Sequence, residues 1–277
     1  MNININGMVR GIATFALLVT VMVRPAFGQA TGFSIELPEV RNYVAVAVGA
    51  VPDYMGSDDY MGGVAPAGLI KFGDSERYAR LIALDLNVNL LDSKTWSLGP
   101  AINYRLARDD VDDAQVKLMR DIDDTVELGL FGGWNWISAD DPRHRFALGA
   151  EFLHDAGGEH DGYLLSGSVR YFKPVTKPLT LSIGASLTYG SSDYTQTYFG
   201  VNTTDSARSG LRQFDADGGV RDIRVPLMAV YSFSPSWHVA GGVIYSRMMG
   251  DAADSPLTAD SGDKDQFYVG AGVAYAW

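Results

Sequence analysis

The sequence ends on Phe267–Trp277 (FYVGAGVAYAW), a segment that decides how the whole chain folds. One parity of this segment holds only apolar residues: Phe267, Val269, Ala271, Val273, Tyr275 and Trp277. Because successive side chains of a strand point to opposite faces, this spacing predicts a strand with one apolar face. The closing strand of bacterial outer-membrane barrels has such a face and ends on an aromatic residue. We therefore expect the segment to close a barrel and to be the part that the barrel-assembly machinery binds.

Segments with the same period recur upstream, separated by turn signals. They include Leu81–Asn89, Trp96–Leu106, Thr125–Trp136, Arg145–Phe152 and Leu179–Tyr189. Their second face carries Gly, Ala, Ser, Thr and Asn with isolated charges, which is typical of the inside of a membrane barrel. We therefore predict an all-β protein, a transmembrane antiparallel up-and-down β-barrel, with a soluble β protein as the alternative.

The number of strands is the open point of this prediction. Eleven segments have a clear strand pattern, beginning with Tyr43–Val51, whereas bacterial barrels have an even number of strands. Either Thr31–Glu39 adds a strand, or Val64–Phe72 is not a strand because Pro66 interrupts it. We expect about 12 strands, with about 10 as the alternative.

The N-terminus has the pattern of a secretory leader. Arg10 precedes the apolar run Gly11–Val23, and Ala26 and Gly28 supply the small residues that a signal peptidase reads. The run is shorter than the roughly 20 residues of a membrane-spanning helix. We therefore predict a cleaved signal peptide over residues 1–28 and a barrel domain over residues 29–277.

The composition excludes several classes of protein. The 277 residues contain no cysteine, which excludes a disulfide scaffold, a thiolate zinc site and a cysteine nucleophile. The formal net charge is −11, and removing Arg10 and Arg24 with the leader makes it −13, which argues against nucleic acid binding. The mean hydropathy of −0.01 excludes several apolar helices, but not a barrel in which half of each strand faces lipid.

Long and short connections alternate along the chain, as outer loops and periplasmic turns do in bacterial barrels. Arg108–Asp124, Gly190–Gly219 and Gly250–Asp265 are long, whereas Lys173–Pro178 and Ser234–Ser236 are short. This alternation predicts a location in the outer membrane of a Gram-negative bacterium, with the C-terminus in the periplasm and the long acidic loops outside. Outer-membrane lipid and lipopolysaccharide would then surround the barrel.

Isolated charges on the small-residue face are expected to point into the lumen. They are Asp85, Arg105, Glu127, Arg145, Glu151, Arg170 and Arg224. We interpret them as charge pairs inside the barrel, although they could equally line a narrow pore. Two further charges, Arg80 and Arg247, fall on the lipid-facing parity at strand ends, where their side chains can reach the interface.

The run Arg108–Glu127 is the strongest candidate for a metal site. Its carboxylates could hold a divalent cation and bridge it to lipopolysaccharide: Asp109, Asp110, Asp112, Asp113, Asp121, Asp123 and Asp124. The run lacks the glycine and the terminal glutamate of an EF-hand in register. A solvated acidic loop is therefore the preferred interpretation.

Histidines offer little support for catalysis. His154–Asp155 and His160–Asp161 flank two glycines in a loop, which does not fix the three or four ligands of a transition-metal site. His144 and His238 look isolated, and the chain has neither a G-x-S-x-G motif nor a recognisable Ser–His dyad. We therefore expect no catalytic residue, no metal, no cofactor and no enzymatic activity.

Five blocks of the sequence resemble the MipA/OmpV family, which is named after an MltA-interacting protein and an outer-membrane protein. In chain order they are VPDYMGSDDY (51–60), NLLD with SLGP (89–92 and 97–100), DIDDTVELG (121–129), YTQTYFGV (194–201) and YSRMMGDAADSP (245–256). Five blocks in this order are more specific than any one of them. One departure is the terminal Trp277, where members more often end in Phe.

The resemblance implies an outer-membrane barrel. For the best-known member it also implies a scaffold that joins a murein-degrading lytic transglycosylase to a bifunctional penicillin-binding murein synthase. Matching assigns no partner-binding residue, and the short turns are where a murein enzyme would dock. Two alternatives stay open: a narrow channel for small solutes, and a surface adhesin that uses Tyr194, Tyr198 and Phe199 of the Gly190–Gly219 loop.

Overall fold

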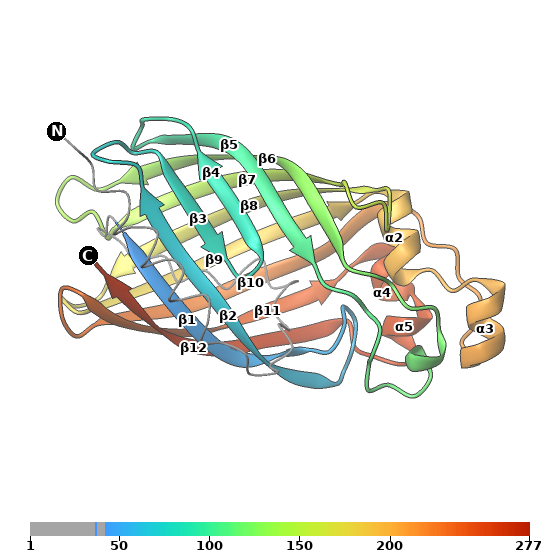
Figure 1. Cartoon of the computed structure of the whole chain (residues 1–277). Coiled ribbons are helices and arrows are strands. Elements are labelled where there is room, and N and C mark those ends of the chain that lie inside the picture. The colour runs from blue at the N-terminus through green and yellow to red at the C-terminus, as the bar shows by residue number, and fades with distance from the viewer. Residues whose placement is uncertain (1–36, 38–41) are drawn as a thin grey trace, which may run out of the picture.

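The computed structural model describes Leu37 and residues 42–277, which form one closed antiparallel β-barrel (Figure 1). The predicted signal peptide lies outside the described residues, as does Thr31–Glu39 apart from Leu37. The twelve strands are β1 (Tyr43–Pro52), β2 (Tyr60–Lys71), β3 (Tyr78–Ile82), β4 (Asp85–Asn89), β5 (Trp96–Arg105), β6 (Thr125–Ile137), β7 (Arg145–Asp155), β8 (Tyr163–Pro174), β9 (Leu179–Gly190), β10 (Gly219–Ser232), β11 (Trp237–Met248) and β12 (Asp265–Ala276). The predicted all-β barrel of twelve strands is therefore confirmed.

The C-terminal strand closes the barrel. Each strand pairs with its neighbours in the sequence, and β12 also pairs with β1, so that Ala274 stands opposite Ala45. Just beyond the ladder, the Trp277 N–H donates to Asn42 O with an N···O distance of 3.2 Å. The sequence prediction that the last strand closes the barrel is thus confirmed, and the structure adds its register.

The twelfth strand arises where the sequence pattern predicted one continuous strand. Leu81–Asn89 is not continuous, because the chain turns back at Ala83 and Leu84 and Ile82 pairs with Asp85. Ala83 has the positive φ of 53° that lets the chain turn there. The parity of the side chains changes at this turn, so Arg80, predicted to face lipid, instead points into the lumen, where it donates to Asn87 Oδ1 at 2.7 Å.

The short β3–β4 hairpin makes the two halves of the barrel wall different. Its tip is held by Ala83 N–H donating to Pro66 O at 2.8 Å and by Tyr104 N–H donating to Leu84 O at 3.1 Å. Beyond this tip, no ladder joins residues 60–65 of β2 to β5 within the described part of the chain. The wall therefore has twelve strands on one side of the tip and ten on the other.

The connections with helices gather at one end of the barrel, here called the loop end (Figure 1). The described helices are the 3-10 helix η1 (Val116–Leu118) and the α-helices α2 (Ser192–Phe199), α3 (Thr203–Ser209), α4 (Gly250–Asp254) and α5 (Pro256–Ala259). Asn202 Oδ1 begins α3 by accepting from Asp205 N–H at 2.8 Å. None of the described helices has the length and apolar character needed to cross a membrane. The opposite end, with the short connections, is called the turn end.

Aromatic side chains edge the outward face at both ends. Near the turn end, the ring centroids of Trp237 and Tyr275 are 5.0 Å apart. Near the loop end, those of Tyr245 and Phe267 are 5.4 Å apart. Between these pairs the outward face is apolar, and Val269 of β12 is 51% exposed. Such an apolar band with aromatic borders is the surface that a membrane barrel presents to lipid.

Closure of the barrel predicts the effect of two glycine substitutions. A Cβ atom at Gly49 would lie 2.2 Å from Val269 O across the β1–β12 ladder, whereas a Cβ at Gly167 meets no atom within 4 Å. We expect Gly49→Val to prevent barrel closure and Gly167→Val to leave it intact. The measurement is the faster gel migration of the unboiled, folded protein relative to the boiled one. A normal folded band for Gly49→Val would contradict the register of this seam.

Candidate functional site

The inner surface of the barrel has an apolar part and a polar part. Near the turn end, small and apolar side chains of β1 and β10–β12 pack together with Leu37. The members of this cluster are Leu37, Tyr43, Ala47, Val230, Ala240, Ala274 and Ala276. Most of the charged and amide side chains of the lumen instead lie on β3–β9. Candidate functional groups are therefore concentrated on that side of the lumen.

The loop end of the lumen is filled by a cap, which we define as the connections 53–59, 106–124, 156–162, 191–218 and 249–264. Two buried apolar clusters hold the cap together. One consists of Met55, Ile122, Leu164, Tyr194, Tyr198, Phe199, Ala216, Met248 and Ala252, and the other of Tyr54, Val111, Val116, Met119, Val201, Leu211 and Leu257. Because both clusters combine residues from several connections, the cap is one packed unit and not a set of separate loops.

A sealed polar cluster lies directly beneath the cap and is centred on Glu127, which is 0% exposed. Arg105 donates to both carboxylate oxygens at 2.8 Å, and Asn103 Nδ2 donates to Oε2 at 2.6 Å. His160 Nε2 is 3.0 Å from Oε1, while His160 Nδ1 accepts from Gly162 N–H at 3.1 Å. This second bond indicates that the ring proton is on Nε2 and that His160 donates to Glu127.

A second ion cluster ties the barrel wall to helix α2. Asp222 is 0% exposed and accepts from Arg221 Nε, while Arg224 Nε lies 3.0 Å from Asp222 Oδ1. Arg221 Nη1 in turn donates to Tyr194 OH at 2.7 Å. Burying charges without partners is costly, so this cluster and the Glu127 cluster fix how the cap sits in the barrel.

The cap also contains a buried arginine of its own. Arg108 is 7% exposed, and its Nη1 donates to Tyr198 O at 3.0 Å. Burial, together with the neighbouring Arg120, lowers the pKa of Arg108 to about 10. Burial likewise raises the pKa of the Tyr198 hydroxyl above its ordinary value. These groups are therefore structural parts of the cap interior and do not face solvent.

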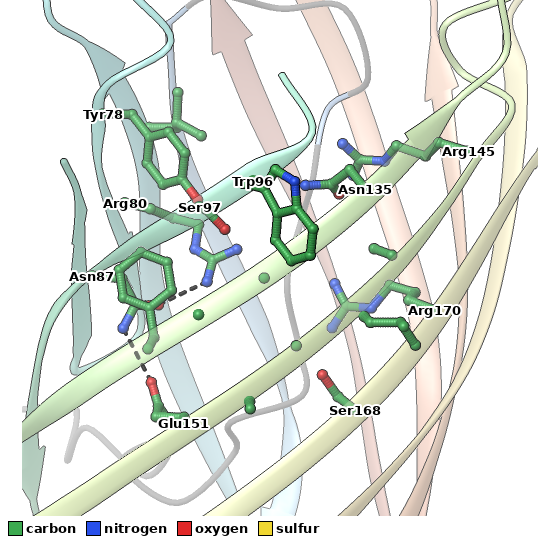
Figure 2. A pocket seen from close by; sticks show the side chains of 18 of the residues that line it. Tyr78, Arg80, Asn87, Trp96, Ser97, Asn135, Arg145, Glu151, Ser168 and Arg170 are labelled. Atoms are coloured by element: carbon green, nitrogen blue, oxygen red, sulfur yellow. Dashed lines mark hydrogen bonds between the residues drawn. The ribbon is translucent and has the colours of Figure 1, made fainter. Parts of the chain in front are cut away.

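The turn half of the lumen contains a cavity of about 760 Å³. Its lining extends from residues of three turns, such as Glu76, Lys94 and Pro142, to mid-barrel residues such as Glu151 and Thr188. The cavity thus lies in the half of the barrel that has twelve strands. Figure 2 shows polar side chains that line it.

Charged groups lie on two sides of the cavity. On one side Arg80 Nη2 donates to Asn87 Oδ1 at 2.7 Å, and Asn87 Nδ2 donates to Glu151 Oε1 at 3.1 Å. On another side, Arg145 and Arg170 point into the cavity (Figure 2). A site of this kind can bind polar or charged solutes, because its donors and acceptors are held on rigid strands.

The structure places the predicted lumen charges at two levels. Arg105, Glu127 and Arg224 lie beneath the cap, and Asp85, Arg145, Glu151 and Arg170 line the cavity. The predicted charges Arg105 and Glu127 form an ion pair with each other, whereas the partner of Arg224 is Asp222, which sequence reasoning missed. An irregularity in the ladder between Val220 and Asp222 lets the adjacent Arg221 and Asp222 both be buried, which the strict period does not predict.

The acidic run has a structural role in the cap. Asp113 Oδ1 accepts from Gln115 N–H at 2.9 Å and Val116 N–H at 2.7 Å, which begins η1. Its six other aspartates are exposed: Asp109, Asp110, Asp112, Asp121, Asp123 and Asp124. Among the described residues, no three His, Asp or Glu side chains are grouped closely enough to hold a metal ion.

The histidines have partners that the sequence did not reveal. His160 joins the Glu127 cluster, and His144 Nε2 is 2.9 Å from Tyr171 OH. His238, predicted to be isolated, has its Nδ1 2.8 Å from Ser232 Oγ. Its Nε2 has no hydrogen-bond partner in the described part of the chain.

The Glu127 cluster predicts a large loss of stability when its acid is removed. Glu127→Ala leaves Arg105 buried without its partner, which costs roughly 3–5 kcal/mol. Asp110→Ala is the matched control, because Asp110 pairs with Lys117 at the surface, where both side chains are about half exposed. We expect the thermal unfolding midpoint to fall clearly for Glu127→Ala and to stay within error for Asp110→Ala. Equal midpoints would show that the cluster does not hold the cap.

Comparisons with known proteins place this barrel among outer-membrane proteins. The chain is 31% identical to outer membrane protein OmpV of Vibrio cholerae over 189 residues, which is 68% of this chain and 66% of that relative, just under two thirds. It is 32% identical to the MltA-interacting protein of Escherichia coli over 83 residues, which is 30% of this chain and 33% of that relative.

The solved structure of a NanC porin is also similar, with a TM-score of 0.49 at 10% identity, over 84% of this chain and 100% of the porin. The model of the family described as "MltA-interacting protein MipA" matches residues 44–277, nearly the whole described barrel. This chain is therefore an outer-membrane β-barrel that belongs to the MltA-interacting protein MipA family.

Proposed function

We propose that the protein is a non-enzymatic outer-membrane scaffold, with its turn end in the periplasm and its acidic loop end outside the cell. The observation that carries this proposal is the cap, which fills the loop end with two apolar clusters above a sealed ion cluster. Because the lumen is filled at one end, the barrel is better suited to bind a protein partner on its surface than to transport solutes through its interior. The cap also keeps most of the acidic side chains on the outer surface, where they suit an aqueous environment.

The turn end offers a rigid surface on which a partner can dock. Arg143 joins two turns, because its Nη1 donates to Thr176 O at 3.0 Å and its Nη2 donates to Asp141 Oδ2 at 2.7 Å. The hydrogen bond from Arg143 holds the pKa of the Asp141 carboxyl below its usual range. We call residues 138–144 and 175–178 the platform. Val175 of the platform is 50% exposed, which leaves an apolar group available for contact.

The partner that we propose is a murein enzyme. Two relatives of this chain are named MltA-interacting protein, and they support a lytic transglycosylase as a partner of this protein as well. A penicillin-binding murein synthase would complete the assembly that a scaffold serves. The barrel-assembly machinery would act earlier, on the C-terminal strand, when the barrel inserts.

Crosslinking in intact envelopes tests the platform directly. A photoactivatable residue replaces Lys177 of the platform or, as the control, the exposed Lys117 of the cap at the opposite end. We expect a lytic transglycosylase to be captured from position 177 and not from position 117. Arg143→Ala should reduce that capture, because it releases the two turns from each other. Capture of no murein enzyme from position 177, or equal capture from both positions, would overturn the scaffold proposal.

A narrow channel is the second candidate function, and the cavity of about 760 Å³ in the same lumen is the observation that favours it. The adhesin hypothesis loses its contact residues, because Tyr194, Tyr198 and Phe199 are 0%, 4% and 0% exposed within the cap. Those aromatic side chains stabilise the cap and are not available to a host surface.

Conductance in planar bilayers separates scaffold from channel. We expect the full mature chain to give no ion steps, because the cap fills one end of the lumen. Deleting residues 192–217, which removes α2 and α3, should produce ion steps, since much of the apolar packing within the cap is lost with them. The faster gel migration of the unboiled deletion variant serves as the folding control. Clear steps from the intact chain would favour the channel.

A further inference from the structure

The wall of the barrel is interrupted on the loop side of the β3–β4 hairpin. The hairpin ends partway along the wall, and β2 and β5 continue toward the loop end without a strand between them (Figure 1). The ladder from β2 to β1 extends to Tyr60, whereas the ladder from β2 to β3 stops at Ala67. We call residues 60–65 the ladder break, because within the described chain they pair with β1 alone.

The ladder break leaves backbone groups without a partner. Alternate residues of an antiparallel strand direct their N–H and C=O groups to opposite neighbours. Pro66 O accepts from Ala83 N–H at 2.8 Å, so Pro66 directs its carbonyl to the β3 side. The register with β1 has no irregularity, so Val64 and Gly62 direct their N–H and C=O groups to that side as well. Among the described residues, no hydrogen bond reaches these four groups.

The unpaired groups lie at the depth of the apolar band. Tyr60 marks the border of the band at the loop end, because its hydroxyl accepts from the N–H of Phe267 at 3.1 Å and Phe267 belongs to the aromatic pair there. Gly62 and Val64 follow toward the turn end, about 7 and 13 Å along the strand from Tyr60. Water is scarce at this depth, so unpaired backbone groups are costly unless the lipid itself supplies partners.

The surroundings of the ladder break suit an apolar chain. Tyr60 and, across the break, Tyr104 of β5 are exposed on the outward face. Behind the break, Ala65 and Ala83 belong to a buried apolar cluster in the lumen. A Cβ atom added at Gly62 would meet no atom of the described chain within 4 Å, so the outward side of this residue is open. An acyl chain can therefore lie directly against the backbone there.

The unpaired groups also narrow the class of lipid. Gly62 and Val64 each present one N–H donor and one C=O acceptor, so a matching ligand needs both donors and acceptors close to its acyl chains. A glycerophospholipid has ester carbonyls at this depth, and these only accept. The glycolipid anchor of lipopolysaccharide has acyl amides and hydroxyacyl groups there, which donate as well. The chemistry of the ladder break therefore favours the glycolipid.

We propose that the ladder break binds one acyl chain of the outer-leaflet glycolipid, whose amide and hydroxyl groups form hydrogen bonds with the backbone of Gly62 and Val64. The site depends on the orientation proposed above, which puts the loop end outside the cell, and not on the murein partner. Lipid that merely surrounds the barrel contacts the apolar band on every strand and shows no preference for this position.

Native mass spectrometry of the full mature chain, refolded in detergent, tests this site. Monophosphoryl lipid A and phosphatidic acid are the probes, since each carries one phosphate group and acyl chains, but only the first has acyl amides and hydroxyacyl groups. We expect monophosphoryl lipid A to bind about tenfold more tightly, which is the effect of one or two net hydrogen bonds.

Substitutions assign the binding to the ladder break. Gly62→Leu fills the open space beside the backbone and should weaken the binding of monophosphoryl lipid A about tenfold, through loss of one or two hydrogen bonds. Gly167→Leu is the matched control, because Gly167 is also an exposed glycine where an added Cβ meets no atom of the described chain within 4 Å. Gly167 has ladder partners on both sides, Ala150 and Leu187, so its substitution should leave the affinity unchanged.

Val64→Pro is the second variant, and it replaces Gly62→Leu if that variant fails the gel test for folding. It removes the N–H group that faces the break without removing a bond of the ladder to β1, and Pro66 shows that this side of β2 accommodates proline. We expect Val64→Pro to weaken the binding of monophosphoryl lipid A several-fold, because one hydrogen bond is lost.

Several outcomes would refute the glycolipid site. Equal affinity for both lipids, or tighter binding of phosphatidic acid, would remove the role of amide and hydroxyl groups. Unchanged affinity in Gly62→Leu and Val64→Pro would assign the binding elsewhere, and an equal loss in Gly167→Leu would reduce it to general lipid contact. None of these outcomes bears on capture of a murein enzyme at the platform, which lies at the opposite end, so the two proposals fail independently.

Discussion

The structure depends on one requirement: inside a bilayer, every backbone N–H and C=O group must find its hydrogen-bond partner within the protein. Strands meet this requirement best when the sheet closes on itself, and here β12 joins the last strand to the first by pairing with β1 from Tyr43 to Ala50. The period of two in the sequence follows from the same requirement, because one face of each strand must then suit lipid and the other the lumen.

Closing the sheet creates an interior, and the two halves of this interior are treated differently. At the loop end, apolar side chains and matched ions occupy the space, so that buried charges such as Glu127 and Asp222 are compensated by neighbouring arginines. In the turn half, charged side chains of the described strands line a cavity. The loop half of the lumen thus contributes stability, while the turn half arranges polar and charged side chains around a cavity.

The period of two made most strands predictable from the sequence, and it placed Arg105 and Glu127 on the lumen face without identifying them as partners. The β3–β4 hairpin was not predictable from the sequence, because Ile82, Leu84 and Leu86 continue the alternation through the turn. The turn also lacks a glycine, since Ala83 has the positive φ of 53° there. His160 was missed because its position depends on how a loop packs under helix α2. Four blocks that carry the family resemblance, 51–60, 121–129, 194–201 and 245–256, contribute residues to the cap. The contacts inside the cap therefore give a structural role to residues that the sequence pattern assigned to loops.

The short hairpin has a mechanical consequence for the barrel. Ladder hydrogen bonds resist separation of strands, but on the loop side of the hairpin tip no ladder joins residues 60–65 to β5 within the described chain. Contacts between connections bridge that part of the wall, such as the 2.8 Å hydrogen bond from Asp112 N–H to Asp53 Oδ2. On the loop side of the hairpin tip, the cohesion of the described wall between β2 and β5 therefore depends on contacts between connections and not on ladder hydrogen bonds.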